Sequence, residues 1–130
     1  MDIQTRSDPV ARARELGADI AAAADEIERT RRIPAPLLER LHDSRLFRML
    51  LPRSAGGDEA APAVYVAAVE ELARHDASTA WIVFVSNSSV LIAAFLEPAV
   101  NRAVFADPRS TVAWGPPNAS RARAVTTAIA

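Results

Sequence analysis

An apolar run over residues 80–96 most constrains what this chain can fold into. The run is apolar on every side at helical spacing and is interrupted only by residues 86–89, Ser-Asn-Ser-Ser. It is shorter than the roughly 20 apolar residues needed to span a bilayer, and no basic cluster flanks it. We therefore expect no membrane span but a core helix of an all-α domain. The residues expected to be among the most buried are Trp81, Ile82, Val85 and Ile92.

The segments around this run have the spacing of amphipathic helices. Before it, Val69 and Leu72 share one face and Glu70 lies on the other, and Asp76 can cap the next helix. The predicted helices cover residues 9–29, 35–45, 62–75, 78–96 and 98–106. Ser110–Trp114, which is followed by Gly-Pro-Pro-Asn, is the only good strand candidate. The sequence thus predicts a loose tail at 1–7, a helical domain at 8–107 and one short terminal strand.

Composition excludes several classes of function. The 130 residues suffice for one domain. With 15 basic and 16 acidic residues, the net charge of −1 gives no electrostatic reason to expect nucleic acid. There is no cysteine, hence no thiol nucleophile and no thiolate metal site. The N-terminus lacks the apolar stretch of a secretory signal, so we expect a cytoplasmic protein.

No catalytic or metal-binding constellation can be identified in the sequence. His42 and His75 have no partner at ligand spacing, so we expect surface histidines and no metal site. Glu70 and Glu71 are adjacent and point about 100° apart on a helix, so they cannot act as a paired acid and base. We therefore name no catalytic residue.

Four pieces of the chain, in order, resemble the acyl-CoA dehydrogenase fold. They are Leu41–Gly57, Glu70–Trp81, the short helix 97–107, and Ser110–Asn118. Together they resemble the N-terminal helical domain and the first strand of the middle β-domain. The most specific piece is the second, E-E-L-A-R-H-D-A-S-T-A-W. The tryptophan that ends it, and W-G-P-P-N in place of the dehydrogenases' T-E-P loop, are most similar to two-component monooxygenases that use reduced flavin.

The resemblance implies a domain plan and an activity. Members continue through a β-domain and a C-terminal helical bundle, which hold most of the flavin site and the usual catalytic base. Residues 108–130 would then begin a truncated β-domain, and the 130-residue chain alone would be inactive. The implied activity is hydroxylation of an aromatic or polyketide-like small molecule with reduced FMN or FAD, O2 and a partner flavin reductase. Acyl-CoA dehydrogenase activity and a non-catalytic helical interaction module are the alternatives.

The resemblance also assigns site residues, each with a structural alternative. The residues assigned to substrate binding, here called the substrate side, are Trp81, Ser86 and Asn87. Those assigned to cofactor binding, the cofactor side, are Trp114, Gly115 and Asn118. The alternative for Trp81 is a core tryptophan. Ser86 and Asn87 could instead bond within their own helix, and the three residues of the cofactor side could lie in a fraying terminal loop. An apolar face left open by the absent parts would favour a homo-oligomer. The chain departs from the family at Arg45, where glycine is expected at the end of a helix.

Overall fold

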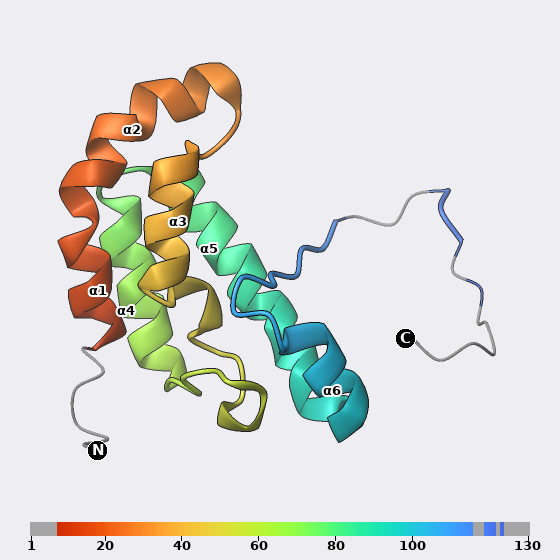
Figure 1. The fold of residues 1–130 in the computed structure, drawn as a ribbon. Helices are drawn as coiled ribbons and strands as arrows, with labels where there is room; N and C mark the ends of the chain where they lie inside the picture. The colour runs from red at the N-terminus through yellow and green to blue at the C-terminus, as the bar shows by residue number, and fades with distance from the viewer. Residues whose placement is uncertain (1–7, 116–118, 122, 124–130) are drawn as a thin grey trace.

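The protein is a bundle of short helices, as the sequence predicts (Figure 1). A computed structural model describes residues 8–115, 119–121 and 123. The α-helices are α1 (Pro9–Glu15), α2 (Gly17–Thr30), α3 (Ala35–Asp43), α4 (Pro62–Ala73), α5 (Ala77–Val90) and α6 (Pro98–Phe105). The 3-10 helices are η1 (Leu46–Arg48), η2 (Arg53–Ala55) and η3 (Leu91–Phe95). The all-α prediction is confirmed.

The first predicted helix, 9–29, is in fact two helices. Leu16 has ψ of −6°, and its N–H bonds to the Ala13 carbonyl, so the chain bends before α2. Figure 1 shows α2 turning away from the axis of α1. At the bend a Cβ on Gly17 would lie 2.5 Å from Nε2 of His75, at the end of α4. The close packing that requires glycine here therefore explains why the chain tolerates its low helix propensity.

The core lies between α1, α4 and α5. α4 packs against α1 on one side and α5 on the other. The buried face of α4 contains Tyr65, Ala68 and Leu72. These residues are three and four positions apart, so they lie on one side of the helix. The other large, fully buried apolar side chains are Ile20, Leu41, Leu46, Met49, Leu51, Val83 and Val90. These positions fix α5, and with it the candidate site, against the rest of the bundle.

The predicted burial along α5 and η3 is wrong. Trp81 is 60% exposed, Ile82 39% and Ile92 54%, and Val85 is half-buried. The opposite side of α5 faces the core instead. Its buried residues are Thr79, Ala80, Val83, Ser86, Asn87 and Val90. Because the helix is apolar all round, the periodicity of the sequence could not predict which face is buried. The face that contains the hydrogen-bonded Asn87 packs on the core.

Ala77–Phe95 has the length and hydropathy of a membrane span, with a mean hydropathy of 1.6. Within it, Asn87 is fully buried and bonded to the backbone of another segment of the bundle. Such cross-segment bonding and the packing of α5 on α4 are typical of a core helix, which passes the same length test.

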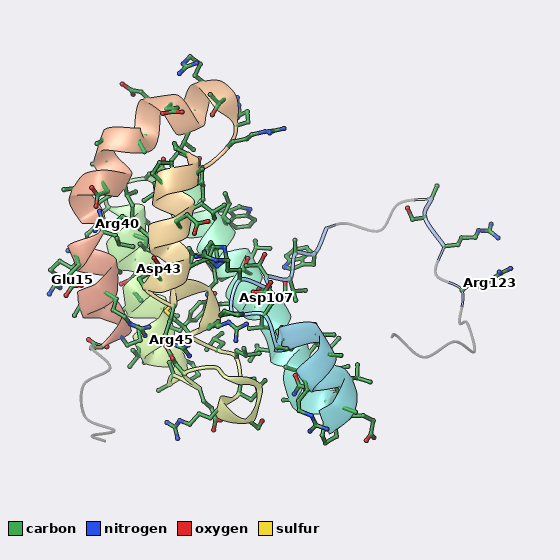
Figure 2. The ribbon with its side chains drawn as sticks, in the orientation of Figure 1. Glu15, Arg40, Asp43, Arg45, Asp107 and Arg123 are labelled. Carbon is green, nitrogen blue, oxygen red and sulfur yellow. The ribbon has the colours of Figure 1, made fainter. Side chains whose placement is uncertain are left out.

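The loop between η1 and α4 is held by buried charges. Asp58 accepts from Arg12 at 2.7 Å and from Arg45 at 3.0 Å. Figure 2 shows Arg45 at the end of α3. It adopts the left-handed conformation expected there, with φ of 61°, and its bonds to Asp58 offset the strain of on the order of 1 kcal/mol. Gly57 is needed for close approach rather than positive φ, because a Cβ there would lie 1.8 Å from the Leu51 carbonyl oxygen.

The predicted strand at Ser110–Trp114 is absent: residues 110–115 have no regular structure, and no other described residue is in a strand. A strand needs a partner for its ladder of hydrogen bonds, and the described part of the chain offers none. What orders the segment after α6 is Arg48, which donates to the carbonyls of Phe105 (3.1 Å), Asp107 and Pro108 (3.0 Å).

Replacing Arg48 by methionine should therefore release α6 from the bundle. Charge-assisted hydrogen bonds of this kind are worth about 1.5–3 kcal/mol, so we expect a comparable loss of local stability. Hydrogen exchange of the α6 amides should accelerate by at least tenfold, while amides of α4 stay protected. The matched control is Arg53→Met, since Arg53 is exposed in η2 and its side chain makes no described contact. Equal protection of α6 in both variants would refute the role of Arg48.

The histidines are more enclosed than predicted. Both His42 and His75 are half-buried rather than on the surface. The His42 ring lies on Phe47, with ring centroids 4.8 Å apart, and its Nδ1 is buried without a partner in the described part of the chain. Burial lowers the pKa of His42 below 6.5, and the positive charge of Arg109 lowers it further. The carboxylates on its own helix α3, which act in the opposite direction, are smaller influences.

The lowered pKa of His42 predicts a pH dependence of stability. The unfolded chain binds this proton more readily than the folded chain, so stability is complete above pH 6.5 and falls as the pH drops below it. The slope should be a fraction of the ~1.4 kcal/mol per pH unit that one full proton gives. Urea unfolding between pH 7.5 and 5.5 should show this slope reduced in His42→Phe and retained in His75→Gln. An identical slope in His42→Phe would assign the effect to other groups.

Candidate functional site

A hollow lies where the start of α5 meets the end of α2. Its volume is about 360 Å³, within the range of roughly 300–1,000 Å³ of small-molecule sites. The residues that line it are Ile27, Glu28, Arg31, Arg32, Ile33, Ala77, Ser78, Trp81 and Ile82. We call this hollow the Trp81 groove. Trp81, one of the residues assigned to the substrate side from the sequence, forms one wall of it.

Two helix ends build the groove. α5 begins at Asp76, whose carboxylate accepts a hydrogen bond from the Thr79 N–H at 2.6 Å, as the sequence predicts for a cap. This cap fixes the first turn of α5, from which Trp81 projects. On the other side, α2 ends at Arg31, which is left-handed with φ of 57°. The chain reverses there, and Ile33 after the reversal lines the same hollow as Trp81.

A stack of three aromatic rings supports Trp81. Its ring lies 5.5 Å from that of Phe84, at an interplanar angle of 29°. Phe84 in turn lies 6.2 Å from Tyr65 of α4, at 18°. The Tyr65 hydroxyl donates to the Phe84 carbonyl at 3.0 Å, and burial raises the pKa of its phenol. The indole is thus packed against Phe84 while 60% of the residue stays exposed, so it can stack on a further ring.

The rim of the groove has more positive than negative charge. Arg31 lies 3.6 Å from Glu28, an exposed pair on the same helix end. The guanidinium of Arg32 forms no ion pair or hydrogen bond with the described residues, although the backbone carbonyl of Arg32 accepts from the Thr30 hydroxyl at 3.2 Å. The first turn of α5 also lines the groove at Ala77 and Ser78, but the carboxylate of Asp76 already caps that helix N-terminus, so the excess positive charge comes from the arginines. An anionic group would therefore be accommodated at this end of the groove.

Ser86 and Asn87 lie on the other side of α5, away from the Trp81 groove. Asn87 is fully buried: its Oδ1 accepts from the Leu50 N–H at 3.1 Å, and its Nδ2 donates to the carbonyls of Leu46 (2.7 Å) and Val83 (2.9 Å). Ser86 is 6% exposed. The structure therefore separates the three residues predicted for the substrate side. The contacts of Asn87 are those of a residue that fixes η1 to α5.

The residues predicted for the cofactor side lie apart from the groove. Trp114 is 59% exposed, Gly115 is exposed, and neither lines the Trp81 groove. Figure 1 shows the described chain after α6 leading away from the helices. Asn118 lies outside the described residues. The structure thus leaves the predicted cofactor side without a defined geometry.

The described residues offer no other constellation for chemistry. No three His, Asp or Glu side chains among them gather as metal ligands would. Glu28 is the only carboxylate lining the groove, and it is exposed beside Arg31. The sequence reasoning missed Ile27, Ile33 and Arg32 as site residues. The signal that could have found them is Ile33-Pro34 after a basic run, which places a helix end and a reversal there.

Comparisons with known proteins agree on one family. The family model for the acyl-CoA dehydrogenase N-terminal domain matches residues 10–106. The oxygenase subunit HsaA of a flavin-dependent monooxygenase from Rhodococcus jostii (strain RHA1) is 37% identical over 59 residues, 45% of this chain and 15% of that protein. The crystal structure of 3-HSA hydroxylase from Rhodococcus sp. RHA1 matches with a TM-score of 0.72 and 25% identity, over 79% of this chain and 27% of that one. The chain thus spans less than a third of either relative.

Proposed function

Since this chain belongs to the acyl-CoA dehydrogenase family, we propose that it supplies the N-terminal helical domain of a flavin-dependent monooxygenase. The reaction would be hydroxylation of an aromatic substrate with O2 and with reduced flavin supplied by a partner reductase. What supports the oxygenase over a dehydrogenase is that both relatives, one by sequence and one by structure, are named as a monooxygenase subunit or a hydroxylase.

In the structure, one observation carries this proposal: the exposed Trp81 ring in a groove of about 360 Å³. An indole held on one side by Phe84 and open on the other is suited to bind an aromatic ring. In the proposed role, Trp81 orients the substrate and keeps water from one of its faces. Asn87 contributes indirectly, because its bonds to η1 fix the helix from which Trp81 projects.

The described residues could contact a flavin along one edge only, because they supply no second wall for its ring system. Flavin, as FMN or FAD, would supply the reactivity with O2, and the protein would position the substrate. Trp114 offers an exposed ring for contact, but no wall stands opposite: a Cβ on Gly115 would meet nothing within 4 Å. We propose that Trp114, Gly115 and Asn118 touch the cofactor only when a β-domain holds them.

A chimera tests the proposed function. Residues 8–107 of this chain would replace the matching domain of the HsaA-type oxygenase, which supplies the remaining domains. With a flavin reductase and O2, the chimera should form hydroxylated product, and Trp81→Ala should raise KM by about tenfold, the scale of one well-placed ring contact. Trp81→Phe, which keeps an aromatic ring at this position, would serve as the conservative control. A chimera that folds and oxidises reduced flavin, yet forms no product, would contradict the proposal.

The apolar side of α5, η3 and α6 should cause these 130 residues to self-associate. The exposed large apolar residues there include Ile92, Leu91 and Phe95, the last 88% exposed. Apolar patches of this kind mark interfaces, so we expect sedimentation velocity to show oligomers at concentrations of tens of micromolar. Phe95→Lys should shift the distribution towards monomer, whereas Val66→Lys, at an exposed position of α4, should leave it unchanged. A monomeric parent chain would rule out the predicted homo-oligomer.

A further inference from the structure

The Trp81 groove offers a stacking surface that the rest of the bundle does not use. Tyr65, Phe84 and Trp81 form a continuous stack, with the inner rings packed in the bundle. The outer ring ends at the groove, which the apolar side chains of Ile27 and Ile33 also line. A planar ligand placed there would contact the indole and these aliphatic groups. Offset stacking on such a surface favours aromatic over aliphatic ligands of equal area.

The charges at the same groove select for an anion. Two arginines, Arg31 and Arg32, stand against one glutamate, Glu28. Arg31 and Glu28 form an ion pair at 3.6 Å, so their opposite charges offset each other. The guanidinium of Arg32 therefore remains available for a ligand. An arginine presents a planar fork of donors that matches a carboxylate.

Together these observations define a ligand. We propose that the Trp81 groove binds planar aromatic carboxylates, with the ring on Trp81 and the carboxylate on Arg32. A volume of about 360 Å³ admits a ligand of about two fused rings with a substituent. The ligand's role as the substrate rests on the proposed function, but its binding does not, because every residue of the groove lies within this chain.

Calorimetric titration of the full chain with two naphthalene probes tests this assignment. 2-Naphthoate should bind about tenfold more tightly than the uncharged 2-naphthamide, as expected for one charge-assisted contact. Arg32→Gln should remove this difference, while Arg102→Gln, an exposed arginine of α6 outside the groove, should preserve it. Trp81→Leu should weaken both probes by at least tenfold. Trp114→Leu is the matched control, because Trp114 is exposed to the same degree, 59% against 60%.

Three results would overturn the inference. They are equal affinity for the two probes in the parent chain, a preserved preference for naphthoate in Arg32→Gln, and equal effects of the two tryptophan substitutions. Circular dichroism of each variant would confirm that the helices are intact, since all four side chains are exposed. The titration requires neither flavin nor O2. If the probes bind as expected but the chimera makes no product, only the proposed function is refuted.

Discussion

Asp58→Ala is expected to lower the free energy of unfolding by about 3–5 kcal/mol, the range for breaking a buried ion pair from one side. The carboxylate of Asp58 joins Arg12 of α1 to Arg45 at the end of α3, at 2.7 and 3.0 Å. The side chains of Arg12 and Asp58 are each only 9% exposed. Alanine would leave the guanidinium of Arg12 buried without its counter-charge. Urea unfolding followed by circular dichroism measures the loss.

The control for this variant is Asp25→Ala. Asp25 is an exposed carboxylate of α2 that makes no described ion pair, and exposed charges of this kind are worth about 0–1 kcal/mol. A domain is stable by only about 5–15 kcal/mol, so Asp58→Ala could unfold much of the population. If the two variants lost equal stability, the Asp58 cluster would not be the link between α1, α3 and the loop.

Asn87→Leu is expected to cost about 2–4 kcal/mol although leucine has a similar volume and greater hydrophobicity. Asn87 is fully buried and serves three backbone groups, those of Leu46, Leu50 and Val83. Each buried group left without a partner costs about 1–3 kcal/mol. The loss should appear in thermal unfolding, and amides of η1 should exchange faster than those of α1.

The neighbouring Ser88 provides the comparison for Asn87. Its hydroxyl bonds only to the Val85 carbonyl of the same helix, at 2.9 Å, and it is half-buried. Ser88→Ala should therefore change stability by less than about 1 kcal/mol. An Asn87→Leu variant as stable as the parent would show that η1 is held by packing alone, and would free Asn87 for the substrate contact first predicted for it.

The sequence predicts which segments are helical because local patterns determine this. The caps at Asp76 and at the prolines, and the stripe through Ala13, Ile20 and Ile27, are contained within a few turns of chain. At Arg45 the resemblance pointed to glycine at the end of a helix, and the structure shows that the arginine keeps a left-handed conformation there. The break at Leu16 was not predictable, because it depends on His75, nearly sixty residues away.

The candidate site was predicted less well, and the reason is physical. Periodicity identifies a buried face only when the opposite face is polar, and α5 has no charged residue on either side. Trp81 was therefore placed in the core, whereas it stands 60% exposed. Arg32 and Ile33 meet it only through the fold, so no spacing in the sequence connects them. The prediction of a strand at 110–114 was wrong for a related reason. A strand forms its ladder of hydrogen bonds with a second strand, and no local pattern in the sequence shows whether one is present.

The Tyr65–Phe84–Trp81 stack also makes the groove optically active. Rings held at fixed angles of 18° and 29° in an asymmetric environment couple their electronic transitions, which gives rise to near-ultraviolet circular dichroism in a well-packed protein. An aromatic ligand bound on the exposed face of Trp81 would add a fourth ring to this stack of coupled chromophores. The chain thus contains its own chromophore for reporting when the groove is filled, without a label.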